Sequence, residues 1–275
     1  MARCWRPSAA VSPEDRWDLP ALRRQLASGL SGCSLELVEC IASTNSELMR
    51  GLRLGRQEKR LLIAEHQTAG RGRLGRQWID GPAKDNDAGG GDLLFSICLP
   101  LDSPHWSGLS LCVGVALANS LHVDVQLKWP NDLWLGGRKL AGILIETTSV
   151  GVSRHVVLGV GINVAARAAA GWDTAPAWAQ EVLPGIAAPG LLQRVLPALL
   201  LALQQFSAFG LQPFLPGFAA RDLLRDRSVL LSDGTTGIAR GVDGDGALLV
   251  HTALGTKTVT SSEVSVRPVA TGGEG

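Results

Sequence analysis

A short run of alternating glycine and arginine is the strongest chemical signal in this 275-residue chain. The run is Gly70, Arg71, Gly72, Arg73, Leu74, Gly75 and Arg76, followed by Gln77 and Trp78. Glycine lets the backbone approach a ligand closely. Arginine supplies a permanent positive charge and a planar group that suits phosphate or carboxylate. We therefore expect a loop that closes over an anion.

Two other interpretations of this run must be weighed. Its spacing matches the dinucleotide fingerprint G-x-G-x-x-G, but that motif needs a helix opening through its last glycine. Gly81 and Pro82 interrupt the chain too soon for such a helix, and no Gly-Lys-Ser/Thr ending is present for a phosphate-binding P-loop. On this run alone, an Arg/Gly-rich surface loop that binds RNA stays open.

A second polar segment surrounds a predicted hairpin. Lys128 and Lys139 fall on predicted strands, where lysine is disfavoured. Between them, Pro130 stiffens a turn, and Asn131 and Asp132 offer oxygen ligands that would suit Mg²⁺. An Asn-Asp turn is also common after a strand, so the dipeptide alone does not decide.

Neutral polar groups and bare backbone complete the set of candidates. Ser43, Thr44 and Asn45 stand at a predicted helix start, where they either cap the helix or bind a ligand. Gln67 precedes the arginine run and by default is a solvated residue. Two glycines of residues 159–163 share one face of a strand, which fits either a ligand against bare backbone or a bulge.

The elements that must position these residues follow from periodicity, caps and turns. The expected helices span residues 18–30, 43–54, 103–122, 191–209 and 213–224. The expected strands of the larger part span residues 61–65, 93–99, 125–129, 133–135, 139–147 and 156–163, with Gly136 and Gly137 as a hairpin turn. Residues 165–190 are expected as a loop. After residue 227, short strands alternate with Asp/Gly-rich turns, which predicts a small barrel of about five strands.

Composition excludes several classes of protein. The formal net charge is +1, so no globally basic surface for nucleic acid is present. The five cysteines form no C-x-x-C pair, and Cys98 and Cys112 lie in apolar runs typical of core residues in a reducing compartment. The histidines lack zinc-site spacing. We expect no segment that approaches a membrane span of about 20 apolar residues and no signal peptide, which favours a cytoplasmic protein.

Four of these segments together resemble the biotin protein ligase family. They are residues 65–73 (EHQTAGRGR), 128–132 (KWPND), 139–144 (KLAGIL) and 159–163 (GVGIN), and they occur in the family's order and spacing. The resemblance extends from Ser43 nearly to the end of the chain. It implies an ATP-dependent enzyme that makes biotinyl-5′-AMP and transfers biotin to a lysine of a biotin carboxyl carrier protein.

The resemblance also implies roles for individual residues. The catalytic set is Lys139, Arg71, Arg73 and Lys128. The biotin-binding set is Ser43, Thr44, Asn45, Gln67, Gly70, Arg71, Gly72, Arg73, Trp129, Lys139, Gly142, Leu144, Gly159 and Gly161. The ATP-binding set is Arg73, Arg76, Lys128, Asn131, Asn163 and Arg267. Asn131 and Asp132 would hold Mg²⁺, Trp172 or Trp178 would cover adenine, and residues 70–82 would be mobile in the empty enzyme.

The implied fold is α+β. We expect a tail over residues 1–17, a catalytic domain with a mixed sheet and packed helices over 18–225, and a small SH3-like barrel over 226–270. Biotin and ATP would be substrates, with Mg²⁺ as activator and no tightly bound prosthetic group. A homodimer through an exposed edge strand is compatible with this fold.

Three rival functions fit the sequence less well. Only some 42 residues precede Ser43, too few for the DNA-binding domain of the family's repressors, so we expect a monofunctional ligase without nucleic-acid or membrane partners. A lipoate or octanoate ligase shares the fold but uses a different glycine-rich signature. A non-catalytic biotin-binding regulator would not need Lys128, Asp132 and Lys139 together.

Overall fold

The computed structural model describes residues 12–79, 91–100, 106–166, 176–260 and 266–268. Its helices are α1 (Pro13–Arg16), α2 (Leu19–Gly29), α3 (Thr44–Arg53), α4 (Leu109–Leu121), α5 (Ala188–Phe209) and α6 (Leu215–Ala219), with 3-10 turns at Arg73–Gly75, Ala179–Glu181 and Gln212–Phe214. The strands of the larger sheet are β1 (Ser34–Ile41), β2 (Arg60–Gln67), β3 (Leu93–Pro100), β4 (Gln126–Lys128), β5 (Asp132–Leu135), β6 (Arg138–Val150) and β7 (Ser153–Ile162).

The centre of the molecule is a mixed seven-stranded sheet in the order β1-β2-β3-β7-β6-β5-β4. Only β1 and β2 run parallel, and every other neighbouring pair is antiparallel. Gly136 and Gly137 both have positive φ and close the β5–β6 hairpin, as predicted. Strand β7 lies between β3 and β6, so segments 93–100 and 138–150 are brought onto one continuous surface.

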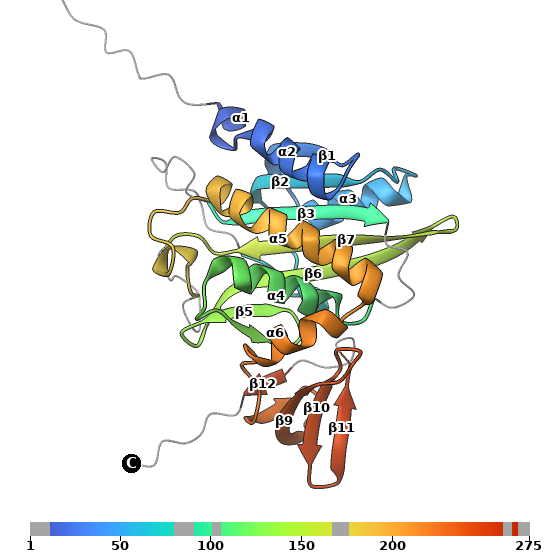
Figure 1. The fold of residues 1–275 in the computed structure, drawn as a ribbon, viewed down its shortest axis with the longest axis vertical. Coiled ribbons are helices and arrows are strands. Elements are labelled where there is room, and N and C mark those ends of the chain that lie inside the picture. Colours follow the sequence, from blue (N-terminus) through green and yellow to red (C-terminus); the bar gives the residue numbers. More distant parts are fainter. Residues whose placement is uncertain (1–11, 80–90, 101–105, 167–175, 261–265, 269–275) are drawn as a thin grey trace, which may run out of the picture.

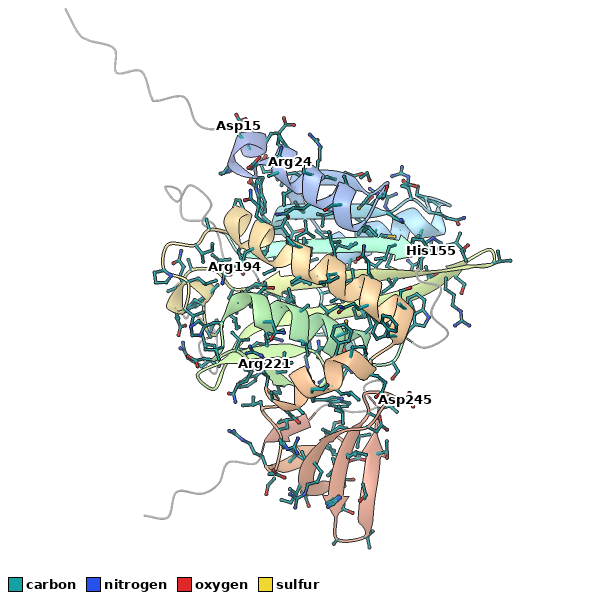
Figure 2. All side chains as sticks on the ribbon, viewed as in Figure 1. Asp15, Arg24, His155, Arg194, Arg221 and Asp245 are labelled. Atoms are coloured by element: carbon teal, nitrogen blue, oxygen red, sulfur yellow. The ribbon has the colours of Figure 1, made fainter. Side chains whose placement is uncertain are left out.

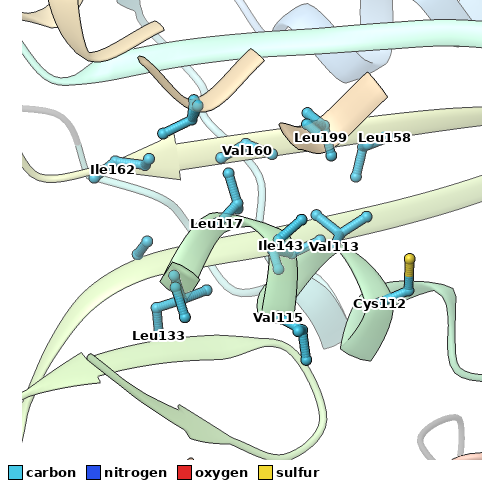
Figure 3. Packing of buried hydrophobic residues seen from close by; sticks show 14 of the residues in the cluster. Cys112, Val113, Val115, Leu117, Leu133, Ile143, Leu158, Val160, Ile162 and Leu199 are labelled. Atoms are coloured by element: carbon cyan, nitrogen blue, oxygen red, sulfur yellow. The ribbon is translucent and has the colours of Figure 1, made fainter. Parts of the chain in front are cut away.

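Helices cover the two faces of this sheet unequally. Helices α2, α4 and α5 lie across one face, whereas α3 contacts the other through β2, β3, β6 and β7 (Figure 1). Helix α4 is apolar on nearly all sides because it is sandwiched between the sheet and α5. Its Val113 and Leu117 meet Ile143 and Val160 of the sheet (Figure 3). The second face is therefore left partly open beside α3.

Two buried cysteines belong to these layers, as expected. Cys112 lies on α4 and Cys98 on β3, and both are almost fully buried. Burial raises the pKa of the Cys98 thiol to about 11 and that of Cys112 well above its usual range, because a thiolate is poorly solvated there. Both thiols therefore serve as small apolar residues.

The C-terminal unit is a second, antiparallel sheet. Its strands are β8 (Ser228–Leu231), β9 (Thr236–Val242), β10 (Leu248–Thr252), β11 (Gly255–Val259) and β12 (Val266–Pro268), in the order β11-β10-β9-β8-β12. The five strands match the expected SH3-like unit. Within the described residues β11 and β12 stay unpaired edges, so the sheet is open where a closed barrel was expected.

Several expected elements differ in extent. The helix expected over 103–122 begins at Leu109, after Gly108 turns the chain with φ of +80°, and residues 101–105 lie outside the described part. The helix expected over 213–224 ends at Ala219, because residues 221–223 run beside β4 instead. Residues 165–190, expected as a loop, contain the turn Ala179–Glu181.

The expected tail over residues 1–17 is also only partly a tail. Residues 13–16 form α1, Trp17 is 3% exposed, and the Trp17 indole and Arg16 both donate to the Glu65 carboxylate. An apolar ring and a charged pair anchor this segment to β2. Residues 1–11 lie outside the described part.

One described helix differs from the expectation that no segment could span a membrane. Helix α5 is long and apolar enough to do so by length and composition. Half of its apolar stretch is buried, and it lies against α2 and α4. Its apolar character is thus that of a core helix.

Candidate active site

The arginine run, the lysine segment and the polar helix start meet in one cavity of about 160 Å³ on the open face of the sheet. Strands β3, β5, β6 and β7 form its floor, and α3 and the arginine run form its walls. Its described lining residues are Ser43, Thr44, Asn45, Gln67, Arg71, Gly72, Arg73, Leu74, Arg76, Gln77, Trp78, Phe95, Lys128, Trp129, Pro130, Asn131, Asp132, Lys139, Gly142, Ile143, Leu144, Gly159, Val160 and Gly161.

Strand register explains why residues so far apart in sequence share this floor. Gly161 of β7 pairs with Gly142 of β6, which pairs with Asp132 of β5, which pairs with Lys128 of β4. Cross-strand partners point to the same face of a sheet. Two bare glycines and two charged residues therefore form one row across four strands.

The glycines leave room that other groups fill. A Cβ on Gly161 would lie 2.7 Å from the Trp78 ring, and one on Gly142 would lie 3.1 Å from it. A Cβ on Gly159 would lie 2.2 Å from Asn45 Oδ1. The absence of side chains at these positions thus lets α3 and the loop approach the sheet directly.

The inner end of the cavity is polar and neutral. Ser43 caps α3 by accepting from the Ser46 amide, as its sequence context predicts. Gln67 Oε1 accepts from the Thr44 amide at 2.8 Å and from Thr44 Oγ1 at 3.1 Å. Asn45 is 3% exposed. Capping and pocket lining, posed as alternatives for Ser43, are combined here.

Ser96 belongs to this polar end and was not foreseen from the sequence. It lies on β3, fully buried, with Oγ 2.7 Å from Thr44 Oγ1 and donating to Asn45 Oδ1 at 2.6 Å. A lone serine in the apolar strand Leu93–Pro100 is the signal that could have revealed it.

The arginine run forms a small hairpin over the cavity. The Gly72 amide donates to Arg76 O at 2.7 Å, and the Trp78 amide donates to Gly70 O at 2.9 Å. Gly70 does not line the cavity, but a Cβ there would lie 2.6 Å from Trp78 O. Gly70 therefore permits the hairpin to close. The expected mobility of residues 70–82 stays a prediction, and residues 80–82 lie outside the described part.

Two arginines of the hairpin take different partners. Arg71 pairs with Glu146 of β6, at 2.9 Å from Nη2 to Oε1. Arg73 Nη1 donates to Asn131 Oδ1 at 3.3 Å. Burial lowers the pKa of Arg73 because the charged guanidinium is poorly solvated there. The negative charge of nearby Asp132 offsets part of this decrease. Glu146 was also not foreseen, although it shares the face of Gly142 and Leu144 by alternation.

Lysines occupy the outer end of the cavity. Lys139 Nζ lies 2.8 Å from Asp132 Oδ1 and 5.6 Å from the centroid of the Trp78 ring. Lys128 Nζ lies 4.6 Å from the centroid of the Trp134 ring. Trp78 and Trp134 thus orient the two ammonium groups.

The cavity is strongly cationic although the chain as a whole is nearly neutral. Its described lining carries five cations, Arg71, Arg73, Arg76, Lys128 and Lys139, against the one carboxylate of Asp132. This concentration of charge suits a site where anions meet.

A resident metal centre is not built into the described residues. No three His, Cys, Asp or Glu side chains converge there. Asn131 Nδ2 donates to Ile143 O at 2.6 Å, and Asp132 is engaged by Lys139. One carboxylate suits an Mg²⁺ ion that keeps most of its ligands from water and substrate phosphates.

Besides Gly70, three sequence-predicted residues lie outside the main cavity. Asn163 lines a neighbouring hollow of about 140 Å³ with Trp78, Lys139 and Pro176, and its buried Oδ1 has no hydrogen-bond partner. Arg267 lies on β12 opposite Leu230, with only its backbone described. Trp178 is buried near this hollow, where the Ala177 and Ala179 amides bond Lys139 O and Asn163 O. Trp172 lies outside the described residues.

Comparison with known protein families first identifies the class of protein through two family models. The model described as the biotin/lipoate A/B protein ligase family matches residues 37–163. The model described as the biotin protein ligase C-terminal domain matches residues 228–267.

Individual relatives narrow this class. The chain is 35% identical over 261 residues to the bifunctional ligase/repressor BirA of Escherichia coli K12, covering 89% of this chain and 77% of the relative. It is 31% identical over 238 residues to the biotin–acetyl-CoA-carboxylase ligase of Paracoccus denitrificans, covering 81% of this chain and 96% of the relative. The solved biotin protein ligase from Aquifex aeolicus in complex with biotin and ATP aligns with a TM-score of 0.70 at 25% identity, covering 86% and 99% of the two chains. The chain belongs to the biotin protein ligase family.

Proposed function

We propose that this chain activates biotin with ATP as biotinyl-5′-AMP, with release of pyrophosphate, and then transfers biotin to a lysine of a biotin carboxyl carrier protein. The observation that carries this proposal is the polarity of the cavity. Neutral hydrogen-bonding side chains gather around Thr44 and Gln67, the Trp78 ring covers the bare backbone of Gly142 and Gly161, and Lys139 lies beside that ring at the cationic part of the lining. Biotin has the matching order of groups: a neutral ureido head, an apolar bicycle and a carboxylate tail.

The inner end would bind the ureido head. Ser43, Thr44 and Gln67 supply neutral donors and acceptors, which suit a neutral group better than charged ones would. Trp129, which is 2% exposed, and the glycines of β6 and β7 would wall the bicycle. Asn45 and Leu144 lie at the same end of the cavity.

The cationic end would allow two anions to react. A carboxylate about 4 Å from a phosphate charge is repelled by about 4 kcal/mol at an effective dielectric near 20. Arg73, Lys128 and Lys139 lie where they would offset this repulsion and stabilise the negative charge at the α-phosphorus. The carboxylate oxygen attacks that phosphorus, and the bond to pyrophosphate breaks.

Mg²⁺ would be carried mainly by the phosphates of ATP, with Asp132 and Asn131 as its protein neighbours. Its chemistry when bound is to neutralise phosphate charge. Lys139 already neutralises Asp132, so the ion would share that carboxylate with the lysine.

Adenine would lie in the hollow beside Asn163. The unpaired Asn163 Oδ1 is a free acceptor for an exocyclic amine. Arg76 lines the adjoining cavity, and Trp178 or Trp172 would cover the base. Arg267 belongs to the proposed ATP-binding set through the family resemblance alone.

The remaining assignments concern partners and organisation. We retain 18–225 as the catalytic domain and 226–270 as the C-terminal domain, with a role in the cytoplasm independent of nucleic acid and membranes. A net charge of +1 gives no globally basic surface, which supports a function without nucleic acid. Strand β1 lies at an edge of the sheet, where a second copy would extend it into a homodimer.

Transfer to a carrier domain tests the proposal. The protein, biotin, ATP and Mg²⁺ are incubated with a biotin carboxyl carrier domain, and biotin is detected on the carrier with streptavidin. We expect labelling that requires ATP and disappears when the acceptor lysine is replaced by arginine. Labelling of the arginine variant to the same extent, or none of either carrier, would contradict specific transfer.

A further inference from the structure

We propose that Glu146 fixes both the arginine hairpin and the proton directions of the polar pocket, and that Arg71 acts through Glu146 as a positioning residue. Arg71 would then not touch the substrate, unlike Arg73. This inference refines the catalytic set and rests on the proposed function for the identity of the ligand.

The contact between the two side chains is bidentate. Arg71 Nη2 donates to Glu146 Oε1 at 2.9 Å, and Nη1 donates to Glu146 Oε2 at 3.2 Å and to Ser46 Oγ at 3.2 Å. Both terminal nitrogens of Arg71 are therefore engaged by β6 and α3. Such paired bonds hold a guanidinium in one orientation.

Glu146 also ends a chain of hydrogen bonds from the polar pocket. Asn45 Nδ2 donates to Glu146 Oε2 at 3.0 Å and to Leu144 O at 3.3 Å. Ser96 Oγ in turn donates to Asn45 Oδ1 at 2.6 Å. The Glu146 carboxylate and the Leu144 carbonyl can only accept, so together they hold the Asn45 amide with Oδ1 toward Ser96, and Ser96 must donate to it.

This direction decides what Thr44 offers to a ligand. Ser96 has one hydroxyl proton, which goes to Asn45, so Ser96 can only accept from Thr44. The single Thr44 hydroxyl proton therefore has two protein acceptors, Ser96 Oγ at 2.7 Å and Gln67 Oε1 at 3.1 Å. With its proton held by these protein acceptors, the Thr44 hydroxyl can offer a ligand in the cavity only a lone pair. A lone pair there is suited to accept from a ureido N–H, so Glu146 would set the preference for that group from a distance.

An isolated exposed ion pair contributes little, so the test includes a second bidentate Arg–Glu pair for comparison. Arg60 pairs with both oxygens of Glu36 at 2.8 Å, away from the cavity. The Arg60 side chain is 6% exposed against 46% for Arg71, so Glu36→Gln breaks a more buried bidentate pair without touching the polar chain. This variant serves as the control for Glu146→Gln.

The first experiment needs no substrate. Trypsin is added to the ligand-free protein, and cleavage after Arg71, Arg73 and Arg76 is followed by mass spectrometry. We expect Glu146→Gln to raise cleavage there about tenfold, as expected for loss of a charged hydrogen-bonded pair, and Glu36→Gln to leave it unchanged. No increase, or an equal increase at arginines throughout the chain, would overturn the proposal.

The second experiment is a double-mutant cycle on the KM for biotin in pyrophosphate exchange. Glu146→Gln and Arg71→Gln are each expected to raise this KM about tenfold with the KM for ATP unchanged, and the double variant to match the single ones. Effects that multiply would show that Arg71 acts independently of Glu146 and would overturn its assignment. Absence of exchange in the unmodified protein would instead contradict the proposed function, while the trypsin result would still decide the role of Glu146.

Discussion

At the scale of single residues, Lys139 is the side chain whose position bears most directly on the proposed reaction. Its ammonium group lies between the Asp132 carboxylate and the face of Trp78, at the cationic end of the cavity. A positive charge held there in advance needs no reorganisation when negative charge develops on the reacting groups. The Lys139 side chain is 41% exposed, close to the 42% of Lys257, so its place between Asp132 and Trp78 distinguishes it rather than burial.

The Lys139→Ala variant should lose adenylation while still binding biotin through the neutral pocket. We expect the rate of pyrophosphate exchange to fall about 10²–10³-fold, which is typical for removal of one preorganised electrostatic group. The control is Lys257→Ala, which removes a lysine paired with Asp233 in the C-terminal sheet. A protein that only binds biotin would lose affinity alone, so equal exchange rates in both variants would count against catalysis by Lys139.

At the scale of elements, the sheet determines the site through its register. The row of Gly161, Gly142, Asp132 and Lys128 exists because β7 enters between β3 and β6. Bare backbone in this row receives Trp78 from the hairpin. The strands and the loop therefore form one binding surface.

A methyl group in this row should disturb the hairpin. In Gly161→Ala the new Cβ would lie 2.7 Å from the Trp78 ring, so the ring and its loop must move. We expect the KM for biotin to rise about tenfold or more, as is typical of overpacking, with little change in melting temperature because Trp78 belongs to a surface loop. The control is Gly190→Ala in α5, where a Cβ would lie 3.4 Å from Ile186. An unchanged KM in Gly161→Ala would refute the account of this row.

The sequence alone predicts those features that depend on residues adjacent in the chain. Ser43 as a helix cap and the Gly136-Gly137 turn follow from local chemistry, and both are confirmed. The pairing of Arg71 with Glu146 joins residues 75 positions apart and depends on strand order, which periodicity does not encode. The early end of α6 likewise follows from a tertiary contact with β4.

At the scale of the whole molecule, the C-terminal sheet is joined to the wall of the cavity. The Trp129 indole N–H donates to Gly246 O at 2.9 Å, and Ser107 Oγ donates to Asp245 O. Figure 2 places Asp245 at the junction between the two sheets and Arg221 on the catalytic side. Trp129 therefore both lines the ligand cavity and holds the C-terminal unit.

Removal of this bond should loosen the junction. Trp129→Phe keeps an aromatic wall but leaves Gly246 O without its donor, which we expect to lower the free energy of unfolding by about 1–3 kcal/mol. Hydrogen exchange should increase at residues 243–247. The control is Trp134→Phe, since the buried Trp134 Nε1 has no hydrogen-bond partner to lose. Equal protection of residues 243–247 in both variants would argue against this link.

The central claim is that the cavity selects biotin and joins it to AMP. The most direct test is exchange of labelled pyrophosphate into ATP with biotin, lipoate or octanoate as the only acid. We expect exchange with biotin alone, because the neutral polar end of the cavity matches a ureido head that the other two acids lack. Exchange with lipoate or octanoate in place of biotin, or with none of the three in a sample that binds biotin, would contradict it.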